Sequence, residues 1–459
     1  MQRQTTEALQ TWFQSAHRKS LILRGARQVG KTWVIRDFAK KNDLNLVEIN
    51  FERSPEFKDL FERSLDPDRV VDNIELLIAR PINRKKCLIF FDEIQDCPHA
   101  ITALKHFTES RSAPPVVAAG SYLGMFDGQS EGVSQPVGYV DEIEMWPLSF
   151  QEFLEASNPH PSLLAVLCDE TRLDRTLHAK LLEIYREYLF VGGMPEVVRD
   201  WYRLKQNGES IFERQSYVRE LQKRLLSLYK TDFAKYHPRD ALAIGRTWEI
   251  VAEQLSRSFE EVKRFTFKDQ MPKKRDYKAF ANYFSRLEAC RLVHLSHILS
   301  HPTYPLKANK KDAFFKSFYF DTGLLLAQMD YEYIALDGKA DVPYKGPVAE
   351  NFVATVLARR GLSLFSYMKA NSAAEIEFVA QAHGEVVPIE VKNNNTTAKS
   401  LASFKTDFAP KFSLMFSNQV GRVTPDFAHY PIYLCDLAVK RHLIDEPKGI
   451  VSKKSRGDV

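Results

Sequence analysis

A glycine-rich segment between a predicted strand and a predicted helix constrains the fold more than any other feature. Gly25, Gly30, Lys31 and Thr32 fit the spacing G-x-x-x-x-G-K-[ST]. Residues 21–24 before it predict a short buried strand, and residues 31–41 after it carry apolar side chains at helical spacing. Strand, glycine loop and helix in this order are the context in which such a loop holds phosphate, so the sequence predicts an α/β fold.

The chemistry of the loop predicts a role for each of its residues. Glycines let backbone amides approach an anion closely, and the positive end of the following helix attracts phosphate. Lys31 is predicted to contact the β- and γ-phosphates and to assist catalysis, and the Thr32 hydroxyl is predicted to bind Mg²⁺. The predicted nucleotide-binding residues are Gly25, Ala26, Arg27, Gln28, Val29, Gly30, Lys31 and Thr32.

A second apolar run, residues 88–91, ends in two carboxylates, Asp92 and Glu93. Ligands of open α/β sheets bind at the carboxyl ends of the strands, so these acids should face the phosphate loop. Asp92 is predicted to hold Mg²⁺, and Glu93 to orient and deprotonate the attacking water. After a third apolar run, Ser121 is a candidate for sensing the γ-phosphate or positioning water, although a plain turn explains it equally well.

The choice between adenine and guanine as the bound base depends on one further sequence match. Residues 309–312 read N-K-K-D, which matches the guanine-recognition pattern N-K-x-D. They lie far along the chain in a basic loop, and not at the end of a strand of the same sheet. We therefore interpret this match as chance, and predict ATP with Mg²⁺ as the cofactors.

Length and composition narrow the class of protein. A chain of 459 residues exceeds the roughly 250 to 300 residues of one hydrophobic core, so several domains are expected. The net charge of +5 is too small to indicate a nucleic-acid binder by itself. Five widely separated cysteines favour reduced thiols over a disulfide framework or a zinc site. Without a signal peptide or an apolar run long enough to span a bilayer, a cytoplasmic protein with no membrane contact is expected.

Several motifs together resemble a known family. The segments GARQVGKT, LIFFDEIQ, AAGSYLG, WPLSFQEFL, YLFVGGMPEVV, YFDTGLL, PVAENFV and PIEVK follow the order seen in prokaryotic AAA-like P-loop ATPases fused to a C-terminal domain of unknown function. The resemblance implies an ATPase sheet in which another strand separates the acidic strand from the phosphate-loop strand. It also implies a cation where this chain has Tyr139, and if that cation assists hydrolysis, its loss would weaken turnover.

The middle of the chain is predicted to be helical, apart from a break at Gly192 and Gly193. Two further helices, residues 245–259 and 275–290, precede two strand-like segments, residues 291–299 and 317–323, an order that suggests a winged helix. A basic cluster at its second helix fits either phosphate contacts or a solvated loop of a packing module. The cluster consists of Lys273, Lys274, Arg275 and Lys278.

The C-terminal third has its own α/β pattern, whose order is that of restriction-endonuclease-like folds. A helix at residues 347–360 comes first. Predicted strands then span residues 363–369, 374–381 and 386–392, a helix spans 399–409, and further strands span 411–417 and 431–437.

Side-chain alternation predicts a second charged site in this region. Glu390 and Lys392 share one strand face, and a two-residue turn at His383 and Gly384 would place Glu377 opposite Glu390. With Glu350 as a further candidate ligand, such a site could bind Mg²⁺ and activate water for phosphodiester cleavage. The family usually has Asp at the position of Glu377, so a nuclease, a nuclease-like binding fold and an ordinary charged sheet face all remain open.

These observations predict an ATP-binding and ATP-hydrolysing AAA-like switch that couples its nucleotide state to a C-terminal nuclease-like module. The alternatives are a Mg²⁺-dependent nuclease regulated by ATP and a non-catalytic ATP-binding interaction protein. Besides ATP, the expected partners are nucleic acid, a partner protein or further copies of the chain. The predicted parts are the ATPase domain 1–162, a helical lid or connector 163–236, a winged-helix-like domain 237–330, a restriction-endonuclease-like domain 331–445 and a basic tail 446–459.

Overall fold

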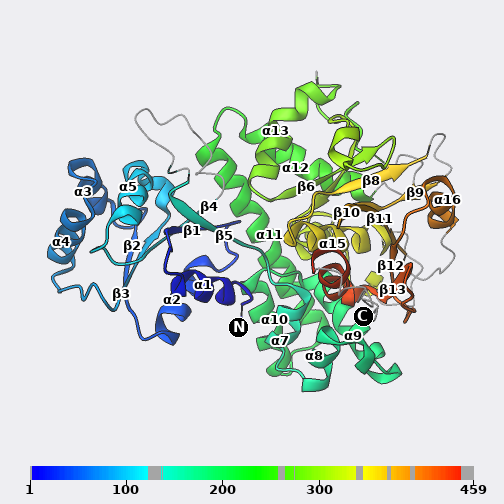
Figure 1. The fold of residues 1–459 in the computed structure, drawn as a ribbon, viewed down its shortest axis with the longest axis horizontal. Helices are drawn as coiled ribbons and strands as arrows, with labels where there is room; N and C mark the ends of the chain where they lie inside the picture. The colour runs from blue at the N-terminus through cyan, green and yellow to red at the C-terminus, as the bar shows by residue number, and fades with distance from the viewer. Residues whose placement is uncertain are drawn as a thin grey trace, which may run out of the picture. The chain divides into compact units, whose positions relative to one another are not determined.

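The computed structural model describes residues 3–121, 136, 138–256, 264–272, 274–336, 345–369, 374–392 and 399–445. Figure 1 shows its helices and strands in chain order. The chain divides into two compact units. Unit one contains Met1–Asn158, Val191–Trp248 and Phe280–Val293. Unit two contains Pro159–Phe190, Glu249–Ala279 and His294–Val459.

Unit one is built on a parallel sheet of five strands in the order β2-β3-β4-β1-β5. β4 lies between the phosphate-loop strand β1 and the acidic strand β3, as the family resemblance implied. Parallel pairing brings the carboxyl ends of all five strands to one edge. The strands are β1 Ser20–Gly25, β2 Asn45–Asn50, β3 Cys87–Asp92, β4 Val116–Ser121 and β5 Val140–Met145.

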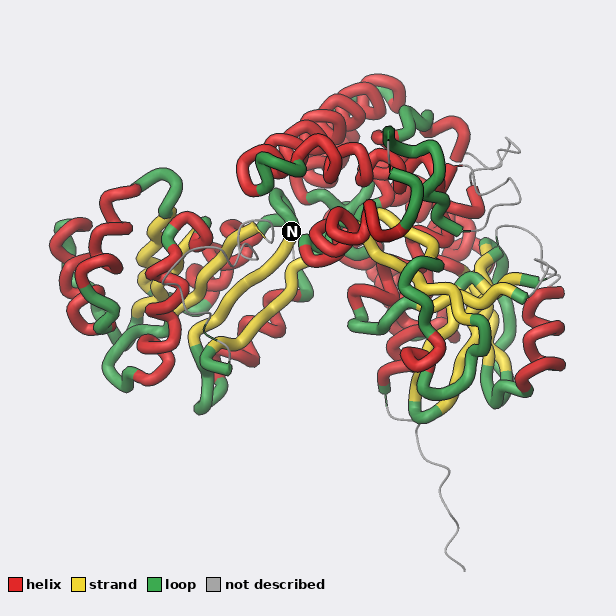
Figure 2. Tube along the Cα trace, turned by 90° about the horizontal axis from the view of Figure 1, so that it is seen from above, coloured by secondary structure: helices red, strands yellow, loops and turns green. Residues whose placement is uncertain are grey.

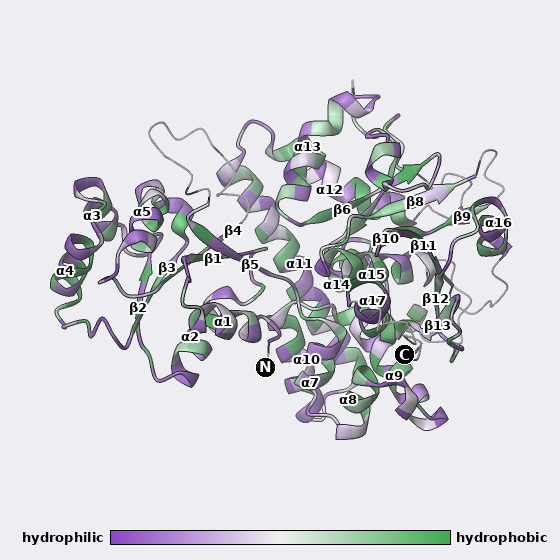
Figure 3. Ribbon diagram, viewed as in Figure 1, coloured by the Kyte–Doolittle hydropathy of each residue, from purple (hydrophilic) through white to green (hydrophobic). Residues whose placement is uncertain are grey.

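Helices cover both faces of this sheet (Figure 2). Alternate strand residues such as Ile89 and Phe91 pack into one apolar core with three helices, while their neighbour Phe90 is also fully buried. Because both faces are covered, β3 is apolar throughout and does not alternate with polar residues. The outer turns of α3 and α4 are largely polar (Figure 3). The helices are α1 Thr5–Gln14, α2 Lys31–Lys41, α3 Lys58–Arg63, α4 Pro67–Ile78 and α5 Pro98–Glu109.

The remaining helices of unit one lie on both sides of the predicted glycine break in the chain, α7 before it and the others after it. Gly193 has no room for a side chain, because a Cβ there would lie 2.3 Å from the carbonyl oxygen of Leu148. The Leu148 N–H donates to the Gly193 carbonyl at 2.7 Å, so two of the motifs that resemble the family pack against each other. These helices are α7 Phe150–Ala156, α10 Pro195–Gln206, α11 Ile211–Tyr236 and parts of α12 Ala241–Ser256 and α13 Tyr277–Ala289.

Unit two contains two mixed sheets of four strands. The first has the order β7-β6-β8-β9, with β6 Val293–Leu299, β7 Phe315–Tyr319, β8 Phe365–Met368 and β9 Glu375–Ile376. The second has the order β10-β11-β12-β13, with β10 Phe378–Ala382, β11 Glu385–Val391, β12 Ser413–Ser417 and β13 Phe427–Pro431. Its helices are α8 Pro161–Cys168, α9 Arg175–Val191, α14 Thr322–Gln328, α15 Lys345–Arg359, α16 Lys399–Phe408 and α17 Cys435–Val439.

Short helical turns connect these elements in both units. They are η1 Pro55–Phe57, η2 Ile94–Asp96, η3 Glu170–Arg172, η4 Leu306–Asn309, η5 Tyr333–Leu336, η7 Ile432–Leu434 and the π-turn η8 Lys440–Ile444.

The sheets of unit two cross the predicted domain boundaries. The two strands expected in a winged helix, β6 and β7, share their sheet with β8 and β9 from beyond residue 330. The compact units also divide within α12 and α13. A separate winged-helix module and the five-part division therefore stay predictions.

One predicted strand, residues 431–437, is wrong. Only Pro431 belongs to a strand, β13, and the rest of the segment forms η7 and α17. The side chains of Ile432, Tyr433 and Leu434 are all buried. Periodicity cannot distinguish a short, fully buried apolar run in a strand from one in a helix.

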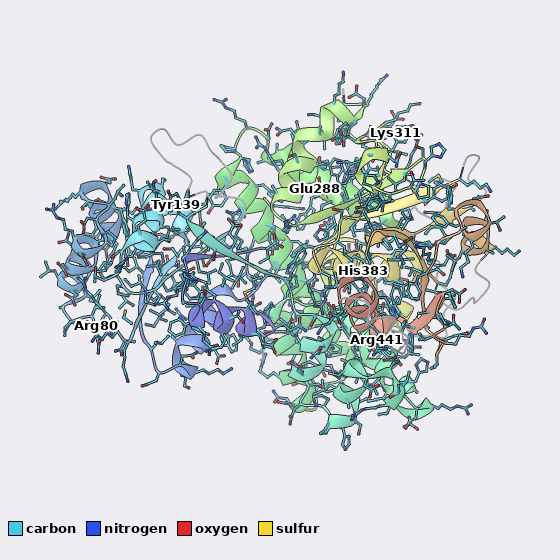
Figure 4. The ribbon with its side chains drawn as sticks, viewed as in Figure 1. Arg80, Tyr139, Glu288, Lys311, His383 and Arg441 are labelled. Atoms are coloured by element: carbon cyan, nitrogen blue, oxygen red, sulfur yellow. The ribbon has the colours of Figure 1, made fainter. Side chains whose placement is uncertain are left out.

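The predicted hairpin between β10 and β11 is confirmed. His383 and Gly384 (His383 is labelled in Figure 4) both have positive φ, 51° and 79°, as a two-residue turn between antiparallel strands requires. The register pairs Phe378 with Ile389, so its continuation by one residue places Glu377 opposite Glu390.

Two further expectations from the sequence concern the cysteines and membrane-spanning helices. All five cysteines are free thiols, four of them buried and Cys168 exposed. None of the helices in the described ranges has the length and apolar content that a membrane span needs.

A buried arginine near the N-terminus connects three parts of unit one. Arg3 is 5% exposed, and its Nε donates to Glu152 Oε1 at 3.0 Å. Its other nitrogens donate to the carbonyl oxygens of Val29 at 2.9 Å and Trp146 at 2.6 Å. Arg3 thus fixes the phosphate loop to the end of β5 and to α7, although no sequence pattern singles it out.

We predict that Arg3→Ala lowers the free energy of unfolding by about 3 to 5 kcal/mol, because the buried Glu152 carboxylate loses its only ion-pair partner in the described residues and keeps only backbone N–H donors. Urea unfolding followed by circular dichroism measures this loss. The matched control is Arg36→Ala, since Arg36 makes a bidentate but exposed pair with Glu48 and should cost less than about 1 kcal/mol. Equal losses in the two variants would contradict the role given to Arg3.

Candidate functional site

The phosphate loop has the backbone conformation that the sequence predicted. It connects β1 to α2, and Gly30 has a φ of 93°, which favours glycine. Gln28 also has a positive φ, 65°. A Cβ at Gly25 would lie 2.4 Å from the carbonyl oxygen of Met145 in β5, so this position accepts no other residue.

Lys31 lies folded back on its own loop. Its Nζ donates to the carbonyl oxygens of Gly25 at 3.0 Å and Ala26 at 2.9 Å. Burial lowers the pKa of Lys31 to about 8, although Glu93 and Asp92 act in the opposite direction. The lysine therefore sits beside both acids, at the position where phosphate oxygens would take over its two carbonyl contacts.

The two predicted Mg²⁺ ligands meet directly. Thr32 Oγ1 donates to Asp92 Oδ2 at 3.0 Å, and Asn50 Nδ2 at the end of β2 donates to the same oxygen at 3.3 Å. Burial and the neighbouring Glu93 raise the pKa of Asp92, while these two hydrogen bonds lower it. A hydroxyl and a carboxylate at hydrogen-bond distance beside a phosphate loop fit a magnesium ion that also binds phosphate.

Glu93 follows β3 with a φ of 51°, which turns the chain sharply at the sheet edge. Its Oε2 accepts a hydrogen bond of 2.6 Å from Gln95 Nε2. The same Gln95 nitrogen donates to the hydroxyl of Tyr236 at 3.2 Å. Glu93 is thereby connected to α11, a helix that the sequence did not place at this site.

Arg27, inside the loop, also contacts α11. Its guanidinium forms a short ion pair with Asp232, which is 1% exposed, and its carbonyl oxygen accepts a hydrogen bond of 2.6 Å from Tyr229. Burial raises the pKa of Asp232, and Arg27 opposes that shift. The predicted nucleotide site therefore lies beside α11 as well as beside Arg27, Asn50 and Glu93.

The two remaining N-terminal candidates differ in position. The backbone of Ser121 pairs with that of Gly25, beside the phosphate loop, but its side chain lies outside the described part of the chain, so its role stays a prediction. Tyr139 (labelled in Figure 4) precedes Val140, which pairs with Ser20 at the opposite end of β1 from Gly25. Five residues of strand correspond to roughly 17 Å, so Tyr139 does not reach the phosphate loop of its own chain.

The C-terminal candidates form a buried charged cluster in unit two. Lys392 Nζ lies 2.9 Å from Glu377 Oε1 and 2.8 Å from Glu390 Oε1, so these three predicted residues do converge. Glu390 is fully buried, and Glu377 also accepts the N–H of Val391 at 3.1 Å. Burial and the Glu390 charge raise the pKa of Glu377 to about 7.

A second lysine, which the sequence did not indicate, completes this cluster. Lys316 in β7 lies 2.9 Å from Glu350 Oε2 and 2.5 Å from Glu375 Oε1. Burial opposes the charge of Lys316, but the two carboxylates outweigh burial and raise its pKa. The chain bends at Glu377, where β9 of one sheet ends and β10 of the other begins, and this bend brings Lys316 to the carboxylates.

The cluster does not fit a magnesium ion in this arrangement. Across the described ranges, no three carboxylate, histidine or cysteine side chains are placed so that they could hold a metal ion. Two ammonium groups occupy the space between the carboxylates instead. A metal site at Glu350, Glu377 and Glu390 stays a prediction that this geometry does not support.

Comparison with known families covers most of the chain in three segments. A family model described as an AAA domain matches residues 17–154. Residues 17–154 are an AAA-type P-loop domain. Two domains of unknown function follow it: DUF8612 matches residues 182–333, and DUF4143 matches residues 345–426. The phosphate loop, Asp92 and Glu93 all lie in the AAA domain, whereas the charged cluster involves both following domains, since Lys316 belongs to the first and Glu350 to the second.

No curated protein matches this chain in sequence. Similar solved structures include a Walker-type ATPase of Pyrococcus abyssi, 14% identical with a TM-score of 0.40, covering 72% of this chain and 95% of that chain. The ORC1 protein of Aeropyrum pernix in complex with DNA is 14% identical with a TM-score of 0.29, covering 72% and 92%. AMPPCP-bound DnaA of Aquifex aeolicus is 13% identical with a TM-score of 0.30, covering 61% and 86%. Scores this low carry no weight for the function of this chain.

The basic residues predicted for a winged helix lie on an exposed surface of unit two. Phe265 makes a backbone hydrogen bond to β7: its N–H donates to the Phe315 carbonyl oxygen at 2.8 Å. Arg264 stacks over the ring of Phe314 at 4.7 Å, and Lys311 (labelled in Figure 4) lies 5.9 Å from the same ring. Lys273 lies outside the described residues. The exposed cations of residues 264–278 and 307–312, called the basic surface below, are Arg264, Lys268, Arg275, Lys278, Lys307, Lys310 and Lys311. Three acids, Asp269, Asp276 and Asp312, are exposed in the same stretches, and Lys310 pairs with Asp312 at 3.0 Å.

The pKa of Lys31 gives a testable pH dependence for the AAA domain. In the empty loop the ammonium is lost above about pH 8, whereas phosphate binding requires it, so ATP binding at pH 9 should be accompanied by proton uptake. Below about pH 7 the lysine is already charged, and its contribution to proton uptake should vanish. Calorimetry in two buffers of different ionisation enthalpy measures the uptake. Equal binding heats in both buffers at pH 9 would contradict this assignment.

Proposed function

We propose that this protein is an ATP-hydrolysing switch whose AAA domain changes state with its bound nucleotide. One observation carries the proposal: Lys31, Thr32, Asp92 and Glu93 gather at one edge of a parallel sheet, with Thr32 Oγ1 and Asp92 Oδ2 3.0 Å apart. Phosphoryl transfer to water uses the groups that these side chains supply, namely a cation, a hydroxyl and two carboxylates.

Each residue has a separate task in this proposal. Lys31 leaves the carbonyl oxygens of Gly25 and Ala26 for the β- and γ-phosphates, where its charge counters the charge that develops during transfer. Glu93 orients a water molecule and accepts its proton. Thr32 and Asp92 would hold Mg²⁺, which when bound neutralises phosphate charge.

We predict that Glu93→Gln retains ATP binding but lowers turnover by at least about 100-fold, since the base is lost while Thr32 and Asp92 remain. Lys31→Ala should instead weaken ATP binding, because it removes the cation that meets the phosphates. Calorimetry and a phosphate-release assay separate the two effects. Unchanged turnover in Glu93→Gln would remove Glu93 from the mechanism, and no turnover in the parent protein would favour a purely structural role for ATP.

For the C-terminal region we propose a binding module in preference to a nuclease. The observation behind this choice is that each carboxylate that a catalytic metal would need already contacts Lys316 or Lys392. Nucleic acid is the partner we propose for unit two, and the basic surface, which precedes the C-terminal region in the chain, is where its phosphate backbone would bind, because exposed cations outnumber exposed acids there. Nucleotide-dependent affinity for this partner would make the protein a switch.

We predict no cleavage of single-stranded, duplex or branched DNA, or of RNA, with Mg²⁺ or Mn²⁺ and with or without ATP. The same substrates should bind with strong salt dependence, and Lys311→Glu should weaken binding and reduce the salt slope by about one ion. Lys85→Glu, an equal charge change on the AAA domain, is the control. Metal-dependent cleavage that Glu390→Ala and Lys392→Ala abolish would establish the nuclease alternative instead.

A further inference from the structure

Three residues of α11 form one stripe that faces the nucleotide site. Tyr229, Asp232 and Tyr236 are spaced by three and four residues, so they lie on one side of the helix. All three make polar contacts with the phosphate loop or the acidic strand end of unit one. α11 lies outside the AAA domain match, in the segment that matches a domain of unknown function.

We propose that this α11 stripe is a positioning element for ATP hydrolysis, which holds the phosphate loop through Arg27 and the Glu93 carboxylate through Gln95. The inference rests on the proposed ATPase function and adds to it the helix that sets the geometry of the reaction. The stripe residues are positioning residues, since they act through Arg27 and Gln95.

The first contact controls the direction of Glu93. Gln95 Nε2 donates to two acceptors, Glu93 Oε2 at 2.6 Å and the Tyr236 hydroxyl at 3.2 Å. An amide held between two oxygens has its side-chain conformation fixed by both of them. Loss of the Tyr236 hydroxyl leaves Gln95 with one anchor, so the carboxylate that it orients gains freedom.

The second contact controls the phosphate loop. Asp232 holds the Arg27 guanidinium, and Tyr229 holds the Arg27 carbonyl oxygen at 2.6 Å, so both the side chain and the backbone of one loop residue are fixed. Asp232 is 1% exposed, so its charge depends on Arg27 for compensation.

The helix itself is anchored by aromatic packing. Tyr229 and Phe233 contact the buried ring of Trp248 at centroid distances of 5.5 and 5.8 Å. Lys235, next to Tyr236 in α11, pairs with Glu52 and Asp96, but these pairs are partly exposed and hold the helix weakly. A rigid helix with two contacts to the site keeps the base and the phosphate loop in a fixed relation.

The test compares Tyr236→Phe with the parent in turnover and in ATP affinity, the latter measured in a Glu93→Gln background. We expect kcat to fall about tenfold with an unchanged Kd, because only the orientation of the base changes. In a Gln95→Ala background, Tyr236→Phe should have no further effect. The control is Tyr217→Phe, which removes another α11 hydroxyl, one that bonds to Asp200. Full turnover in Tyr236→Phe, or an equal loss in Tyr217→Phe, would overturn the proposal.

A second measurement does not depend on hydrolysis. Hydrogen–deuterium exchange of the nucleotide-free protein should be faster at residues 26–30 in Asp232→Asn and at residues 93–97 in Tyr236→Phe, and unchanged in Tyr217→Phe. If the parent hydrolyses no ATP, the proposed function fails, and this exchange pattern still decides whether the stripe holds the site. Unchanged exchange in both variants would overturn the inference even in an active ATPase.

Discussion

The parallel pairing of β4 between β1 and β3 is the constraint on which the nucleotide site depends. It brings the carboxyl ends of three strands to one edge, so that the loop after Gly25 meets Asp92 and Glu93 although many residues separate them in the chain. Close backbone approach then excludes side chains at Gly25, where β5 passes within van der Waals distance. The chemistry of the site follows from the topology of the sheet.

Buried charges join segments distant in sequence at several places in the structure. Arg3 with Glu152 fixes the phosphate loop to α7, and Arg27 with Asp232 fixes it to α11. Such pairs contribute little net stability over apolar packing, but removal of one partner leaves an uncompensated charge, so they define which arrangement is tolerated. The two ion pairs therefore define the position of the phosphate loop relative to α7 and α11 as much as they stabilise it.

The same principle changes the interpretation of the C-terminal region. A strand that bends at Glu377 contributes to two sheets, and the second sheet brings Lys316 to Glu350 and Glu375. A pattern that indicates a metal site in the sequence thus becomes a set of four carboxylates in which each one pairs with one of two lysines. The difference arises because Lys316 comes from a strand that the sequence assigned to another domain.

The sequence by itself determined the phosphate loop, the acidic strand end, the hairpin at His383 and the convergence of Glu377, Glu390 and Lys392. Each depends on local spacing or on strand alternation, which act over a few residues. Only the tertiary structure decided that Arg3, α11 and Lys316 belong to these sites, and that residues 432–434 are not in a strand. These contacts join segments far apart in the chain, and the spacing within one segment does not name its partner, because long-range packing selects the partners and local preference does not.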